Sequence, residues 1–228
     1  MAVQARKRRR RWPFARGSGR HLALVSALLA ASLAALLLWP SPTTALVAVL
    51  LAVLWGLILF FFRDPERVPP EDDGQFLSPA DGRVVAVVPT VQARFPGGDA
   101  LLVSIFMSIF DVHVNRSPIA GRVRAVEHVS GRFLQAFRPE AAEVNEHNFI
   151  ALQNGPTWVL VKQVAGILAR RVVCWAREGD WLEAGQRFGI VMLGSRVDLF
   201  LPPDVEVLVK PGDRVRGGQT VVARPRSR

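Results

Sequence analysis

Residues 187–202 read RFGIVMLGSRVDLFLP, two apolar, strand-like segments on either side of Gly194-Ser195. Short runs of this kind, rich in Val, Ile, Leu and Phe, recur from Phe76 onward and are separated by Gly, Asp, Asn and Pro. This pattern is typical of an antiparallel β domain. We expect strands at residues 82–88, 101–106, 121–128, 149–153, 158–164, 187–192, 197–200 and 205–209, and one short helix at 167–176.

The same part of the chain contains a weak internal repeat. Residues 179–186 (GDWLEAGQ) resemble residues 212–219 (GDRVRGGQ), 33 positions later. In each copy the Gly-Asp turn and the later glycine permit positive φ at two corners, which is the layout of a hairpin in a small barrel-sandwich of the biotinyl/lipoyl kind. A carrier domain of that kind needs a lysine at the hairpin tip, and neither turn has one. The repeat therefore indicates architecture rather than a carrier function.

Two apolar runs precede the β domain. Residues 21–39 and 44–62 are each close to the roughly 20 residues that a helix needs to cross a bilayer, and Pro40-Ser41-Pro42 lies between them. A secretory signal peptide is the alternative for the first run, but a second run follows at once without a convincing small-residue cleavage site. The sequence thus predicts a mainly β, lipoyl-like barrel-sandwich domain with few short helices, preceded by an N-terminal transmembrane helical hairpin.

The charges at the N-terminus predict the orientation of this hairpin. Eight Lys and Arg residues and no acidic residue lie among residues 1–20. The positive-inside rule places such a tail in the cytoplasm, and an even number of spans returns the following chain to the same side. We therefore expect a protein of the inner cell membrane, with its folded domain on the cytoplasmic face.

The basic tail also accounts for most of the net charge of +10. The remaining 21 Lys and Arg residues face 19 acidic residues, so the folded domain is nearly neutral. A nucleic-acid partner is not expected, since such proteins spread basic residues over their folded surface. The only cysteine, Cys174, excludes an internal disulfide and is expected to be a buried structural thiol.

A charged, proline-rich stretch follows the second apolar run. Fixed φ and missing amide donors discourage regular structure in residues 63–75. We expect a basic tail at 1–20, a membrane anchor at 21–62, a linker at 63–75 and a β domain at 76–228.

The Gly194-Ser195 pair suggests a chemical function. Its hydroxyl lies next to the carbonyl of a residue that has no side chain to obstruct attack, so such a serine can cleave its own chain. An ordinary turn is the alternative interpretation, because Gly-Ser pairs are frequent in turns.

Other polar residues occur in strand-like surroundings. Asp81 lies at the mouth of a strand in residues 78–82 (SPADG), where an Asp-Gly turn is the alternative to a functional role. Strand alternation would place Asp111, His113 and Asn115 on one face, where the histidine could act as an acid or base or could be structural.

A further polar segment, residues 143–149, contains His147 and Asn148 directly before a strand. A solvated loop and a substrate-binding role are both open for it. The four histidines show no paired ligand spacing and one cysteine forms no zinc knuckle, so no metal is expected.

Taken in order, six motifs resemble phosphatidylserine decarboxylases of the short bacterial and archaeal class. The resemblance spans about residues 60–209, with the Gly-Ser site near the C-terminus, and the N-terminal hairpin is similar to the membrane anchor of that family. The motifs are residues 62–65 (FRDP), 78–82 (SPADG), 111–116 (DVHVNR), 145–148 (NEHN), 164–166 (VAG) and 193–196 (LGSR).

The resemblance implies a self-cleaving proenzyme of phospholipid biosynthesis. Ser195 would attack the Gly194 carbonyl, and elimination would leave a β chain of residues 1–194 and an α chain of residues 195–228 as a heterodimer. The α chain would begin with a pyruvoyl group derived from Ser195, a covalent cofactor that replaces pyridoxal phosphate. The enzyme would be a carboxy-lyase that converts phosphatidylserine to phosphatidylethanolamine at a membrane.

The resemblance also implies roles for individual residues. Asp81 would assist self-cleavage by orienting a base, and His113 would act in substrate binding and decarboxylation as a proton donor. Arg116 stands where the longer class has a second histidine as the processing base, so His113 is the first candidate for that base and His147 the second. His147 stands where we would expect Arg in this class, and Ile109 stands where we would expect Pro.

Substrate contacts are expected from Asp111, Arg116, His147 and Asn148, with the guanidinium of Arg116 suited to a phosphate or carboxylate. Two other functions stay open at this point. One is a membrane-anchored barrel-sandwich adaptor without catalysis. The other is a pyruvoyl decarboxylase for another serine-headgroup lipid, such as archaetidylserine, or for a soluble amino acid.

Overall fold

The computed structural model describes residues 13–71, 74–135, 140–167, 172–192 and 194–226. The chain divides into two compact units, Met1–Glu66 and Arg67–Arg228.

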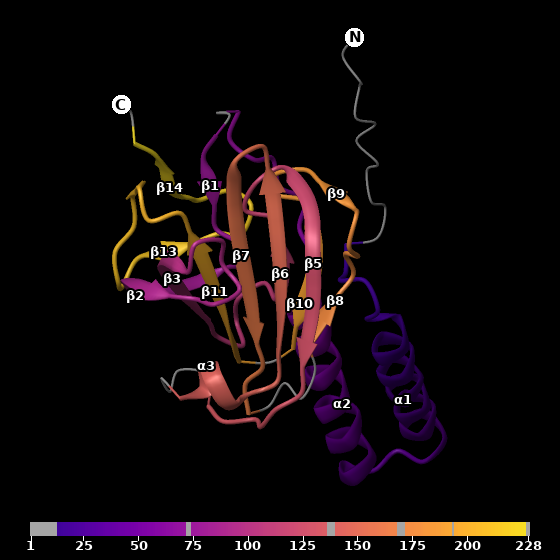
Figure 1. The fold of residues 1–228 in the computed structure, drawn as a ribbon. Helices are drawn as coiled ribbons and strands as arrows, with labels where there is room; N and C mark the ends of the chain where they lie inside the picture. The colour runs from indigo at the N-terminus through magenta and orange to yellow at the C-terminus, as the bar shows by residue number, and fades with distance from the viewer. Residues whose placement is uncertain (1–12, 72–73, 136–139, 168–171, 193, 227–228) are drawn as a thin grey trace. The chain divides into compact units, whose positions relative to one another are not determined.

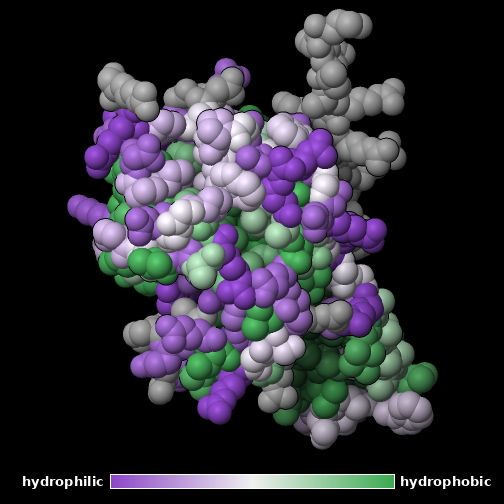
Figure 2. Space-filling view, viewed as in Figure 1, coloured by the Kyte–Doolittle hydropathy of each residue, from purple (hydrophilic) through white to green (hydrophobic). Residues whose placement is uncertain are grey.

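The first unit is a helical hairpin. Helices α1 (Gly19–Leu38) and α2 (Pro42–Phe61) pack side by side (Figure 1), and the Trp55 indole donates a hydrogen bond to the Ser26 hydroxyl at 2.9 Å. Ser41 caps α2 by accepting a hydrogen bond from the Thr44 amide, and Pro42 fits the first turn, where no amide donor is needed. Both helices are long and apolar enough to cross a membrane, and apolar side chains cover their surface (Figure 2).

The second unit is built around an antiparallel sheet of eight strands in the order β13-β2-β3-β11-β7-β6-β5-β9. Strands β7, β6 and β5 run side by side (Figure 1). The eight strands are β2 (Gly82–Val91), β3 (Asp99–Met107), β5 (Gly121–Val129), β6 (His147–Asn154), β7 (Thr157–Val164), β9 (Trp181–Leu182), β11 (Ser195–Leu201) and β13 (Arg214–Val215).

Two sheets of three strands complete the β domain. One has the order β1-β14-β12 and the other the order β4-β10-β8. Their strands are β1 (Phe76–Leu77), β14 (Val221–Pro225), β12 (Val205–Val207), β4 (Val114–Arg116), β10 (Arg187–Val191) and β8 (Val172–Cys174), and one short helix, α3, spans Ala141–Val144.

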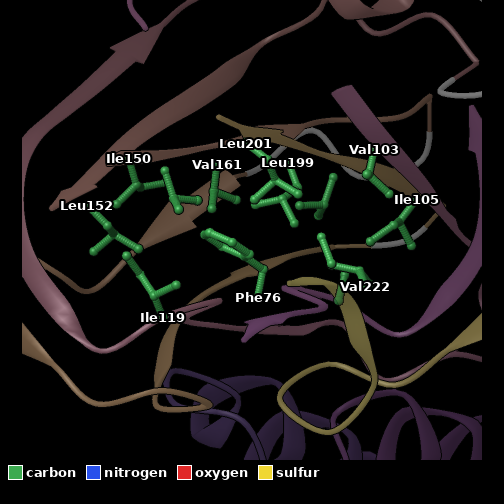
Figure 3. Packing of buried hydrophobic residues seen from close by; sticks show 14 of the residues in the cluster. Phe76, Val103, Ile105, Ile119, Ile150, Leu152, Val161, Leu199, Leu201 and Val222 are labelled. Atoms are coloured by element: carbon green, nitrogen blue, oxygen red, sulfur yellow. The ribbon is translucent and has the colours of Figure 1, made fainter. Parts of the chain in front are cut away.

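A large apolar core packs side chains of all three sheets together. The ring of Phe76 lies beneath Val161 and Leu199 of the large sheet, with Ile119 and Val222 on either side (Figure 3). Burial of such apolar side chains is the main force that holds the layers together.

The predicted fold class, a mainly β domain preceded by an apolar hairpin, is confirmed. Each of the eight predicted strands overlaps an observed one. The predicted helix at 167–176 is wrong where the structure describes it, because Val172–Cys174 forms strand β8 against β10. Its β-branched Val172 and Val173 favour a strand, and residues 168–171 of that prediction lie outside the described residues.

The predicted repeat appears as two equivalent turns. Positive φ occurs at both expected corners of each copy, at Gly179 (90°) and Gly185 (73°) and at Gly212 (100°) and Gly218 (72°). Each turn adds a two-residue strand to one end of the large sheet, β9 beside β5 and β13 beside β2.

Candidate active site

Ser195 is the first residue of strand β11, which lies between β3 and β7. It is fully buried, and its register partner on β3 is Met107. Gly194 has φ +63°, and a Cβ at this position would meet no atom within 4 Å other than those of its chain neighbours. The Ser195 side of this peptide bond is therefore fixed in the sheet, whereas the Gly194 side has free space around it.

The Ser195 hydroxyl belongs to a buried polar cluster. Its Oγ donates a hydrogen bond to the Met107 sulfur at 3.4 Å, and the Asn115 side-chain amide approaches the same sulfur at 3.9 Å. The oxygen of Asn115 accepts a hydrogen bond from Gln163 Nε2 at 2.7 Å. All four side chains are fully buried, so Ser195 lies at the end of a row of side chains that extends into the sheet.

The row continues across strand β6 to the surface. Asn148 Nδ2 donates to Gln163 Oε1 at 3.3 Å, and Asn148 Oδ1 accepts from His128 Nδ1 at 2.7 Å. Asn148 was predicted as a substrate contact. In the structure its described hydrogen bonds go to the neighbouring strands β5 and β7.

His113 is fully buried one residue before strand β4. Its Nδ1 hydrogen-bonds to the Asp111 carbonyl at 2.9 Å, and its own carbonyl accepts from the Val191 amide at 3.3 Å. A carbonyl can only accept, so Nδ1 carries the hydrogen and Nε2 is the basic nitrogen of the neutral ring. His113 thus lies beside the segment that leads into Gly194, with the tautomer that a general base requires.

The prediction that Asp111 shares a strand face with His113 is wrong. Strand β4 begins only at Val114, and Asp111 closes a turn in which its carboxylate accepts from the Ser108 amide (2.8 Å) and hydroxyl (2.7 Å). A short acidic side chain can accept hydrogen bonds from the donors of a tight turn, which favours a turn over a pleated strand at Asp111. Asp111 orients His113 through its backbone carbonyl.

Asp81 lies in a second cluster, at the start of strand β2. Its carboxylate accepts two hydrogen bonds from the buried guanidinium of Arg67 and one from the Gly217 amide at 2.8 Å. Arg67 also donates to the Gly217 carbonyl at 2.7 Å. Arg67 therefore links Asp81 to Gly217, a residue 150 positions after Arg67 in the chain.

Arg116 reaches the same turn from the other side. Its guanidinium donates to the Gly185 carbonyl at 3.2 Å, and a Cβ at Gly218 would lie 2.8 Å from its Cδ. The structure thus brings Arg116 and Asp81 to the adjacent residues Gly217 and Gly218, and it buries Arg116 almost completely.

His147 lies on the other face of the large sheet from Ser195. Strand residues alternate between faces; Phe149, two positions after His147, packs in the outer apolar cluster, whereas Val197, two positions after Ser195, packs in the main core. His147 donates from Nδ1 to the Asn145 carbonyl at 2.6 Å, and burial lowers the pKa of its imidazole despite that bond. This position gives no support to His147 as the base for cleavage.

Cys174 has the properties of a structural thiol. It lies in strand β8, partly buried, with its sulfur 3.5 Å from the Ala176 carbonyl. Burial raises its pKa to about 11, so the thiol is protonated at neutral pH and is a poor nucleophile. Within the described residues, no group of three or more His, Cys, Asp or Glu side chains could hold a metal ion.

Three residues of the site were not predicted from the sequence. Met107 fell just after the predicted strand at 101–106, Gln163 was assigned to the apolar strand at 158–164, and Arg67 was assigned to the linker. The sequence did contain a signal for Gln163, because Lys162 and Gln163 are two polar residues inside the otherwise apolar run of residues 158–164. No sequence signal linked Arg67 to Asp81, since their pairing depends on how the chain folds back.

Similarity to known proteins identifies the family of this chain. The family model described as phosphatidylserine decarboxylase matches residues 55–223. The chain belongs to the phosphatidylserine decarboxylase family. The phosphatidylserine decarboxylase proenzyme of Symbiobacterium thermophilum is 56% identical over 177 residues, which cover 76% of this chain and 82% of the relative.

Two further relatives show how wide the family is. The phosphatidylserine decarboxylase proenzyme of Carboxydothermus hydrogenoformans is 46% identical over 176 residues (77% of this chain, 83% of the relative). The putative archaetidylserine decarboxylase proenzyme of Methanothermobacter thermautotrophicus is 44% identical over 190 residues (78% and 85%). The prediction of a carboxy-lyase of this family is confirmed, and the non-catalytic adaptor is set aside.

Proposed function

We propose that this protein decarboxylates phosphatidylserine to phosphatidylethanolamine with a pyruvoyl group that it makes by cleaving itself between Gly194 and Ser195. The observation that carries the proposal is the contrast at this peptide bond. Ser195 is buried and anchored in strand β11, while Gly194 has free space and a positive φ. The relatives, which are named as proenzymes, support the same conclusion.

Cleavage would proceed through an ester. Ser195 Oγ forms a bond to the carbonyl carbon of Gly194, the C–N bond breaks, and the hydroxyl proton ends on the freed amine. Removal of the Ser195 α-proton then breaks the Cβ–Oγ bond and releases Gly194 as a carboxylate. Water replaces the nitrogen of the remaining unsaturated residue, which leaves as ammonia, and a ketone is left at the start of the α chain.

His113 is the favoured base for these proton transfers. Its Nε2 is the basic nitrogen, and its backbone is hydrogen-bonded to Val191, three residues before Gly194. Asp81, in the arginine-bound cluster, supports cleavage by fixing the Gly217 turn of the α chain against the β chain. Arg116 and His113 remain the candidates for contact with the lipid headgroup.

Once formed, the pyruvoyl group supplies a carbonyl that binds the substrate amine and accepts the electron pair as carbon dioxide leaves. The protein would stay assembled after the cut. Strand β11 of the α chain is hydrogen-bonded to β3 on one side and β7 on the other, which supports a tight αβ heterodimer. The apolar helices and the basic tail support an inner-membrane location with the active domain on the cytoplasmic face.

The test is the intact mass of the purified full-length protein in detergent, beside Ser195→Ala and the control Ser130→Ala. Wild type and Ser130→Ala should give two chains that meet at Gly194-Ser195. The smaller chain should be lighter than a chain starting with serine by the mass of ammonia, and borohydride should add two hydrogens to it and abolish release of carbon dioxide from phosphatidylserine. A folded wild-type chain that stays whole at 25.1 kDa would refute self-cleavage.

A second substrate is favoured by one observation, the 44% identity to a relative named as an archaetidylserine decarboxylase. The two lipids share the serine headgroup and differ in their chains. Matched detergent micelles of each lipid, assayed for carbon dioxide release, separate the alternatives. A kcat/KM for phosphatidylserine at or above that for archaetidylserine supports the first proposal, and the reverse order replaces it.

A further inference from the structure

The side-chain amides of Asn148, Gln163 and Asn115 form a row beside Ser195 in which every hydrogen bond is donated in the same direction. Asn148 Oδ1 can only accept a hydrogen bond, so His128 Nδ1 must be the donor at its surface end. Asn148 then donates to Gln163, and Gln163 donates to Asn115. Because each amide accepts on one side, it presents its NH2 group on the other. The NH2 group of Asn115 is thereby directed at Met107.

Met107 makes this NH2 group a neighbour of the reacting serine. Its sulfur contacts Asn115 Nδ2 at 3.9 Å and Ser195 Oγ at 3.4 Å. A thioether is a weak acceptor, so both donors can leave it for a stronger oxygen acceptor at little cost. The acceptor that cleavage creates is the Gly194 carbonyl oxygen, which becomes negatively charged when Oγ attacks.

The strand packing leaves these amides little freedom. Asn115 and Gln163 are fully buried and Asn148 nearly so. Gly189, the register partner of Asn115, has no side chain, and a Cβ there would lie 2.7 Å from Gln163 Nε2. Because Gly189 has no side chain, the Gln163 amide can lie against strand β10. Any larger residue at position 189 would displace this amide.

We propose that Asn115 is the hydrogen-bond donor that stabilises the oxyanion on Gly194 during self-cleavage, and that Gln163 and Asn148 are positioning residues that act by aiming its NH2 group. The inference rests on the proposed function, since it concerns the same bond. Asn115 itself stays neutral in this role, because its amide only shifts a hydrogen bond from sulfur to oxygen. A donor of this kind typically contributes about 100-fold or more to the rate.

The decisive variant is Asn148→Asp, two residues away from Asn115 in the row. The new carboxylate accepts from His128 and also demands a donor from Gln163. Gln163 must then turn its NH2 group toward residue 148, and Asn115 must turn its NH2 group toward Gln163 and its oxygen toward Ser195. Every hydrogen bond between the amides is kept while the direction of the row is reversed, so a purely structural role predicts little change.

Three variants are compared as full-length protein in lipid nanodiscs, with the cleaved fraction followed by intact mass from the time of synthesis. Asn148→Asp and the direct variant Asn115→Asp should both slow cleavage by about 100-fold while the protein still unfolds in a single cooperative transition. Gln153→Glu is the matched control, since it also replaces an amide by a carboxylate on the same strand, at a half-buried position outside the row, and it should cleave like wild type.

The outcomes separate this inference from the proposal on which it rests. Wild-type cleavage rates in Asn148→Asp, whatever Asn115→Asp does, would overturn the directed row. If Asn115→Asp does not fold, Asn148→Asp alone decides. A wild-type protein that never cleaves would instead refute self-cleavage itself.

Discussion

Residues 78–82 (SPADG) and residues 117–121 (SPIAG) form the same turn twice in this domain. In each turn the serine hydroxyl donates to the carbonyl two residues later, at 2.7 Å for Ser78 and 2.6 Å for Ser117. The turns cross each other through a reciprocal pair of backbone bonds, from the Leu77 amide to the Pro118 carbonyl and from the Arg116 amide to the Pro79 carbonyl, both 2.9 Å.

The glycine-rich repeats dock on these two turns in the same way. The Gly218 amide donates to the Ser78 carbonyl and the Gly185 amide to the Ser117 carbonyl, both at 2.8 Å. Each Ser-Pro turn with its docked repeat is called a turn unit here. The two turn units differ at the residue before the final glycine, which is Asp81 in the first and Ala120 in the second. The backbone of this turn therefore does not need an acid, and Asp81 serves the contacts that only the first unit makes, to Arg67 and Gly217.

The largest expected effect comes from the final glycines, Gly82 and Gly121. Gly82 has φ +150°, and a Cβ there would collide with the Phe106 carbonyl oxygen, while a Cβ at Gly121 would lie 2.8 Å from the Gln153 carbonyl oxygen. Gly82→Ala should lower the free energy of unfolding by about 3 kcal/mol or more and Gly121→Ala by less, because only the first combines a collision with a positive φ. Chemical denaturation in detergent measures both, and equal losses would contradict the difference between the units.

The next effect concerns the acid that distinguishes the two turns. Asp81→Asn leaves the buried Arg67 guanidinium without a charged partner and should cost about 3 kcal/mol. Adding Arg67→Met should restore most of the stability, because no unpaired charge stays buried, but it should not restore the rate of self-cleavage. If the double variant cleaves like wild type, Asp81 acts only as a partner of Arg67 and our proposal for it fails.

The two turn serines provide the symmetric control. Ser78→Ala and Ser117→Ala each remove one buried hydrogen bond of nearly equal length and leave one carbonyl unsatisfied. Each should reduce the free energy of unfolding by about 1–2 kcal/mol, and neither should change the rate of self-cleavage, measured by intact mass. Unequal losses would show that the two units are less alike than their hydrogen bonds indicate.

Much of this architecture was predictable because it follows local rules. The strand runs, the apolar hairpin and the repeat at 179–186 and 212–219 all depend on short-range pattern and turn chemistry. A second signal was available in the repeated Ser-Pro turns, which match the two glycine-rich repeats one to one. The predicted helix at 167–176 failed because pairing with β10 decided that segment.

The site was predictable only in part. Gly194, Ser195, His113 and Asp81 stood out by residue type, but their partners did not. The pairing of Asp81 with Arg67, and of Ser195 with Met107, depends on register and on the return of distant segments, which no local pattern records. The alternation that grouped Asp111 with His113 assumed a strand where the chain makes a turn.

The smallest expected effect is a pH dependence of stability that arises from a residue on the strand facing the second Ser-Pro turn. Gly82 lies against Phe106 on β3, and Gly121 lies against Gln153 on β6. Six residues before these contacts β3 has Ala100 and β6 has His147, so only the strand that faces the second turn carries a titratable group at this position. Burial lowers the pKa of His147 below 6.5 in the folded protein. The unfolded chain therefore binds more protons in this window, and the free energy of unfolding should fall as the pH drops below about 6.5.

His147→Asn tests the source of this dependence, because Asn can still donate to the Asn145 carbonyl and does not titrate near neutral pH. Urea unfolding of the variant should show a flatter dependence on pH between 7 and about 5 than wild type. The rate of self-cleavage should be unchanged, since His147 and Ser195 lie on opposite faces of the sheet. Slower cleavage in His147→Asn, with the pH dependence of wild-type cleavage lost, would return His147 to the list of candidate bases and would weaken the case for His113.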